Sequence, residues 1–160
     1  MNEPQSNFEH ADKTQPSEAV AKLENQRVSR VDRLYGGGLS LHLGDMVRGH
    51  RRERGRWIIT SWGGDWIVEE SRGSLDSRKD DEEAVQAALE RTVGDQVVKA
   101  SVEPSTLDLT MTLNSGVILR LLVDKEYDGD AWTLSLPTGA TISVHGAGEW
   151  SVQPDTPSDK

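Results

Sequence analysis

The chain has 160 residues, of which 34% are hydrophobic and 28% are charged, and its formal net charge is −9 at pH 7. This length predicts a single compact domain. The chain contains no cysteine, which excludes disulfides, thiolate chemistry and cysteine-ligated zinc. Apolar runs of membrane-spanning length and a signal-like start are missing, so we expect a soluble, cytoplasmic protein that does not bind a membrane.

The negative charge is concentrated in the second half of the chain. Residues 23–79 carry a net charge of +3, whereas residues 80–160 carry −10. Such an acidic half disfavours nucleic-acid binding, because it repels phosphate groups. It favours association with a basic protein partner, although acidic surfaces also serve solubility alone.

In the first half, a disordered arm (1–16) is expected to precede a short helix that Ser17 caps and that runs through Leu23. Alternating apolar residues and glycine turns then predict strands. The glycine pair 63–64 is typical of a two-residue hairpin, which would join the last two of them. We expect these strands at 27–35, 39–43, 46–50, 57–62 and 65–70.

The middle of the chain holds a polar linker (71–79) and then the clearest helix. Asp80 and Glu83 have the spacing of a capping box, and Gly94 is typical of a helix end. Strands are expected again in the second half, and the one at 117–123 is apolar on both faces, which predicts a place in the middle of a sheet. These strands are at 96–102, 107–113, 117–123, 131–136, 140–145 and 149–152, before a disordered tail at 153–160.

The two halves repeat a similar pattern. At an offset of 70 residues the leucines at 39, 41 and 43 meet Leu109, Met111 and Leu113, and at an offset of 75 Trp57 meets Trp132. The repeat predicts an α+β, mostly antiparallel β protein made of two related β-meander units, 17–70 and 80–152. Such units would form a sandwich or a barrel, with one helix between them and a short helix at the N-terminus.

The candidate site is an acidic loop in the second unit. The repeat aligns this loop, 124–130, with a basic loop at 51–56, which predicts equivalent positions of opposite charge. Its spacing of acidic residues also partly matches a calcium-binding EF-hand loop, but the closing glutamate is replaced by Ser135. We predict no metal site and no cofactor, and expect the loop to bind a partner together with two tryptophans that suit contact hot spots. The predicted contact residues are Asp124, Glu126, Asp128, Asp130, Trp62 and Trp66.

The remaining polar residues show no catalytic motif. His42 alternates outward between leucines, while His50 and His145 stand at strand ends, where imidazoles are commonly solvated. No sequence pairing assembles these residues into a triad, and the glycine run 36–38 lacks the lysine of a phosphate loop. We therefore expect a protein that is not an enzyme.

The pattern that runs from Leu107-Asp-Leu-Thr-Met-Thr-Leu through Asn-Ser-Gly-Val-Ile-Leu-Arg-Leu and Trp132-Thr-Leu to Gly-Ala-Thr-Ile-Ser-Val is similar to a known kind of unit. It resembles the repeated unit of small bacterial β-rich proteins, some of which are immunity proteins of polymorphic-toxin and contact-inhibition systems. The resemblance spans residues 23–152 and implies a small acidic cytoplasmic binder encoded beside a toxin, without implying particular site residues. The leading hypothesis is therefore an inhibitor that neutralises a basic, nuclease-type toxin. The alternative is a β-barrel module that binds a small molecule or calcium, and the oligomeric state stays open between monomer and weak dimer.

Overall fold

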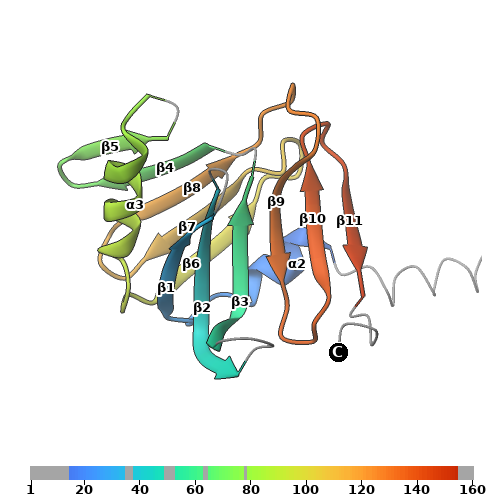
Figure 1. The fold of residues 1–160 in the computed structure, drawn as a ribbon, viewed down its shortest axis with the longest axis horizontal. Coiled ribbons are helices and arrows are strands. Elements are labelled where there is room, and N and C mark those ends of the chain that lie inside the picture. Colours follow the sequence, from blue (N-terminus) through green and yellow to red (C-terminus); the bar gives the residue numbers. More distant parts are fainter. Residues whose placement is uncertain (1–14, 35–37, 49–52, 63–64, 78, 155–160) are drawn as a thin grey trace, which may run out of the picture.

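Two antiparallel sheets enclose a shared hydrophobic core and form the body of the protein (Figure 1). The structure is a computed structural model, and it describes residues 15–34, 38–48, 53–62, 65–77 and 79–154. Most of the predicted arm and tail, the 36–38 glycine run and the 63–64 glycine pair lie wholly or partly outside these residues, as does His50.

The larger sheet has six strands in the order β1-β2-β3-β9-β10-β11, and the smaller has five in the order β5-β4-β8-β7-β6. The predicted mostly antiparallel α+β class is confirmed, and the two sheets are open, so the sandwich is right and the barrel is wrong. The strands are β1 (Val28–Arg33), β2 (Leu39–Arg48), β3 (Glu53–Ser61), β4 (Asp65–Glu70), β5 (Gly73–Asp76), β6 (Val97–Val102), β7 (Leu109–Leu113), β8 (Ile118–Leu122), β9 (Asp130–Ser135), β10 (Thr141–His145) and β11 (Trp150–Gln153).

The two halves of the chain exchange strands. After β3 the chain leaves the larger sheet and enters the smaller one as β4, and after β8 it makes the reverse crossing to β9. Consequently β3 pairs with β9 and β4 pairs with β8, each across the boundary between the halves. The predicted hairpin between 57–62 and 65–70 is therefore wrong. The prediction that the 117–123 strand is central is confirmed, because β8 is the middle strand of its sheet.

The repeat itself is visible in the hydrogen bonds at the junction of the halves. The amide of Asn25 donates to the carbonyl of Val97 at 2.7 Å, and the amide of Gly94, 69 positions after Asn25, donates to the carbonyl of Val28 at 2.8 Å. Asn25 and Gly94 also share a positive φ. The β1–β2 and β6–β7 pairs have matching bulges, after Val28 and after Val97. The halves are thus related by an approximate two-fold exchange.

The strand registers correct the tryptophan alignment. In the larger sheet Trp132 lies opposite Ser61, and in the smaller sheet Trp66 lies opposite Leu121, at the corresponding place. Trp132 therefore corresponds to Trp66 and not to Trp57. Trp132 is fully buried, as predicted, whereas Trp57 is half-buried and packs against the rim of the core.

The helices also differ in part from prediction. The first, α2 (Pro16–Ala21), begins with a buried proline after Gln15, so Ser17 is not its cap and the ordered domain begins earlier than expected. The second, α3 (Glu82–Glu90), buries Val85, Ala88 and Leu89, but it has no side-chain cap. The carboxylate of Asp80 instead accepts the amide of Asp76.

Two further predictions fail at strand ends. The linker 71–79 contains β5, and the last four residues of the basic loop at 51–56 belong to β3. Each helix packs against the first strand of the other half, α2 on β6 and α3 on β1. No helix in the described residues is long and apolar enough to cross a membrane.

Candidate functional site

Acidic side chains gather where the chain crosses between the sheets. The β6–β7 turn (103–108), the β8–β9 connection (123–130) and the β10–β11 turn (146–149) meet at one end of the sandwich, which we call the acidic end (Figure 1). These three segments carry seven carboxylates against the single lysine Lys125. The carboxylates are those of Glu103, Asp108, Asp124, Glu126, Asp128, Asp130 and Glu149.

Backbone hydrogen bonds fix the β8–β9 connection. The amide of Tyr127 donates to the carbonyl of Asp124 at 3.0 Å, and the amide of Gly146 donates to the carbonyl of Gly129 at 2.9 Å. The Asp124 carboxylate accepts the amide of Glu126 at 3.0 Å. A Cβ on Gly146 would lie 2.1 Å from the carbonyl oxygen of Tyr127, so only glycine permits this close approach. The loop is thus held in one conformation against the β10–β11 turn.

Two exposed aromatic side chains belong to this end. Trp62, directly after β3, is 51% exposed, and its amide donates to the carbonyl of Ala131. Tyr127, within the acidic loop, is 38% exposed. Sequence analysis missed Tyr127, although an aromatic residue among four acidic positions was a usable signal. Trp66 is 2% exposed and lies in the core, so the structure removes it from the predicted contact surface.

Three of the four predicted acidic residues are free of ion pairs. Asp124, Glu126 and Asp128 are exposed and have no ion-pair partner among the described residues. The fourth, Asp130, begins β9 and its Oδ1 lies 2.6 Å from Nδ1 of His145. The loop does not correspond to the basic segment at 51–56, because that segment leads into β3 from the β2–β3 hairpin, whereas 123–130 crosses between sheets. In the part of the chain that is described, no three His, Asp or Glu side chains converge as metal ligands.

His145, predicted to be solvated, has partners on both sides. Its Nδ1 faces Asp130, and its Nε2 lies 3.5 Å from the hydroxyl of Ser151. The order of groups is that of a Ser–His–Asp triad. A base that activates a serine lies about 2.6–3.2 Å from the hydroxyl, and the contact here, at 3.5 Å on a partly exposed strand surface, is longer than that. The geometry instead orients the Asp130 carboxylate at the border of the acidic end.

His42 lies on the outward side of β2, as its alternation with Leu41 and Leu43 predicts, but it is buried there. The amide of Gly55 donates to Nδ1 at 3.0 Å, and Nε2 lies 3.0 Å from the carboxylate of Asp32. Burial lowers the pKa of His42, the nearby Arg30 adds to this, and Asp32 opposes it. Both ring nitrogens of His42 have partners in the protein, and the hydrogen bond from Gly55 stabilises the β2–β3 pair beside its bulge.

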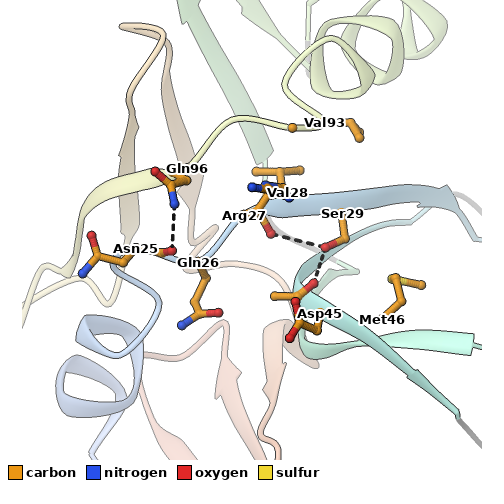
Figure 2. Close-up of a pocket in the computed structure, with 11 residues that line it drawn as sticks. Asn25, Gln26, Arg27, Val28, Ser29, Asp45, Met46, Val93 and Gln96 are labelled. Carbon is orange, nitrogen blue, oxygen red and sulfur yellow. Dashed lines mark hydrogen bonds between the residues drawn. The ribbon is translucent and has the colours of Figure 1, made fainter.

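A cavity of about 470 Å³ lies beside the two-fold junction of the halves (Figure 2). The hydroxyl of Ser29 lies against the carbonyl oxygens of Gly44 and Arg27, and the side-chain amide Nε2 of Gln96 donates to the carbonyl of Asn25 at 3.5 Å. The Gln96–Asn25 hydrogen bond joins the two halves, and the contacts of Ser29 tie β1 to β2 within the first half. The cavity therefore has a structural explanation.

Comparisons of the chain with protein-family models, with curated proteins and with solved structures found no match in any of the three. Among the described residues, the acidic end combines three exposed carboxylates without ion pairs with the exposed side chains of Trp62 and Tyr127.

Proposed function

We propose that the protein is a non-catalytic binding protein that docks a basic protein partner on its acidic end. The observation that carries the proposal is the combination of Asp124, Glu126 and Asp128, exposed and without ion pairs, with the exposed rings of Trp62 and Tyr127 at the same end. Aromatic residues supply contact area at interfaces, and carboxylates supply complementarity to lysine and arginine.

The loop is suited to binding because its shape is set in advance. Its hydrogen bonds to the β10–β11 turn hold the backbone, so little ordering free energy is lost when a partner docks. The excess of negative charge attracts a basic partner over distances comparable with the Debye length, about 8 Å at physiological salt. Electrostatic attraction of this kind acts mainly on the association rate.

The resemblance to immunity proteins, together with the acidic end, supports a particular class of partner. A cytoplasmic inhibitor of a toxin encoded beside it gains from rapid association, and nuclease-type toxin domains are basic because they bind phosphate backbones. We therefore propose an immunity-type inhibitor, with the toxin domain as its partner and the acidic end as the contact surface.

The test uses the basic toxin domain encoded by a neighbouring gene. The variant Asp124→Asn/Glu126→Gln/Asp128→Asn removes three carboxylates and leaves the Asp130–His145 pair intact. The control Glu18→Gln/Glu53→Gln/Glu83→Gln makes the same charge change at exposed positions on other parts of the molecule. Association rates are measured at low and high salt, and protection of toxin-expressing cells is scored.

We expect the loop variant to associate at least about tenfold more slowly at low salt, with a flatter salt dependence, while the control stays near wild type. Equal rates for the loop variant and the control would remove the acidic end from the interface. Failure of the toxin to bind, with a melting temperature that rises in calcium or with a metabolite, would support the ligand-binding alternative instead.

A further inference from the structure

The outer face of the six-stranded sheet carries a continuous row of short polar side chains. Strand registers place one such residue from every strand side by side across the sheet. Since neighbouring strands are about 4.8 Å apart, the four central hydroxyls span about 14 Å. From β1 to β11 the row is Asp32, Ser40, Thr60, Thr133, Ser143 and Ser151.

The four central hydroxyls have no hydrogen-bond partner in the described chain. Ser40 and Ser143 are only 4% and 8% exposed, yet neither hydroxyl is paired, and both lie on the outward side of their strands. Thr60 and Thr133, between them, are half-buried and equally unpaired. The only fully buried side-chain polar atom without a partner in the described residues is Nε1 of Trp66, so these hydroxyls reach the surface. There they can donate and accept hydrogen bonds to a ligand. A second, partial row continues with Ser135 and Thr141.

The outer face of the smaller sheet shows that such a row is not a necessity of the fold. It has the same strand arrangement by the two-fold exchange, but Arg120 and Glu69 form an ion pair there at 3.3 Å. The positions that correspond to Thr60 and Thr133 are Arg120 and Ile67. The hydroxyl row is therefore specific to one of two structurally equivalent faces.

The centre of the hydroxyl face is uncharged and has an aromatic border. The row itself carries no charge from Ser40 to Ser143, and the charged outward residues of these strands lie farther along them, with Arg54 and Arg56 on β3 and the Asp130–His145 pair on β9 and β10. Inward-facing Ile59 and Ser61 place Trp62 on the outward side at the end of β3. Its ring lies beside Gly38, where a Cβ would come within 3.4 Å of Cε3.

We propose that this face binds a neutral oligosaccharide. A sugar ring offers hydroxyls that both donate and accept hydrogen bonds, which matches the unpaired Ser and Thr groups, and an apolar C–H face that packs on an exposed indole such as Trp62. A protein partner fits less well, because serine is depleted at protein interfaces and the face presents little apolar surface besides Ile58. An anionic ligand finds no cation within the row itself, because the arginines of β3 lie beyond Ile58.

The experiment titrates cellohexaose, xylohexaose, chitohexaose and maltohexaose into the full-length protein by calorimetry. Thr60→Val/Thr133→Val removes two hydroxyls while keeping shape and β-propensity, and Thr110→Val/Thr112→Val makes the identical change on the opposite face. Trp62→Ala removes the stacking surface. Melting temperatures establish that each variant is folded.

We expect the wild type to bind at least one of these hexasaccharides. The Thr60/Thr133 variant and Trp62→Ala should each weaken that binding at least about tenfold, and the Thr110/Thr112 variant should stay within about twofold. Absence of binding at millimolar sugar, or equal loss in both threonine variants, would overturn the proposal. The acidic-loop variant should bind the sugar normally, so this outcome is independent of the toxin experiment.

Discussion

The two equivalent tryptophans, Trp132 and Trp66, differ in one hydrogen bond. The indole N–H of Trp132 donates to the carbonyl of Leu107 at 3.0 Å. The indole N–H of Trp66 is buried without a partner. Both side chains are at most 2% exposed and occupy matching places in the two sheets, so substitution by phenylalanine removes the same atoms from similar surroundings.

The expected difference in stability follows from these contacts. Trp132→Phe loses a hydrogen bond that contributes about 0.5–1.5 kcal/mol, whereas Trp66→Phe removes an unsatisfied donor whose burial costs about 1–3 kcal/mol. Cavity costs are similar in the two variants, so they largely cancel in the comparison. Trp66→Phe should therefore be more stable than Trp132→Phe by about 1.5–4.5 kcal/mol.

The assay is urea and thermal unfolding followed by circular dichroism, with the exposed Trp62→Phe as a control near wild type. For a chain of this size the difference corresponds to about 3 °C or more in melting temperature. If Trp66→Phe unfolds at the same temperature as Trp132→Phe or below it, the argument from hydrogen-bond satisfaction is refuted.

Three further outcomes are expected. Burial lowers the pKa of His42 below its ordinary 6.5. As the pH falls, the unfolded chain therefore takes up the proton before the folded one, and the free energy of unfolding decreases as the pH drops through 6.5. Between pH 7.5 and pH 5 the melting temperature of His42→Asn should fall by less than that of the wild type. Gly146→Ala forces a Cβ onto the Tyr127 carbonyl and should cost about 1–3 kcal/mol, detectable by thermal unfolding and absent in Ala147→Ser. Ser151 should not react with a fluorophosphonate probe, and Ser151→Ala should bind the partner normally; specific labelling of Ser151 would contradict the non-catalytic assignment.

Local patterns predicted the elements well because they depend on neighbours in the sequence. The alternation of Leu39, Leu41 and Leu43 indicated an inward face, and all three are buried. The stripe of Val85, Ala88 and Leu89 likewise marked the buried side of α3. Gly94 has the positive φ expected after a helix.

Pairing between distant strands was not predictable in the same way. A period of two fixes which face a residue occupies but not which strand lies beside it, and a glycine pair fits a crossing between sheets as well as a hairpin. The mistaken match of Trp57 with Trp132 arose because an offset of 75 was used after the first long loop, whereas the strand registers pair Trp132 with Trp66 at an offset of 66. Trp66 was placed on the contact surface as part of the expected hairpin around 63–64, although its register with Leu121 in the smaller sheet turns it inward.

The exchange of strands also explains where the two halves are able to differ. The crossings after β3 and after β8 lie side by side, since the strands that they join are paired, and both ends of each crossing are held by ladder hydrogen bonds. A longer crossing therefore leaves the core unchanged, and the closure entropy of a longer loop grows only slowly with its length. The first crossing is short and the second is the extended acidic loop. The paired strands thus tolerate a short crossing after β3 and a long one after β8. The long crossing carries the charged residues on which binding of a basic partner is proposed to depend.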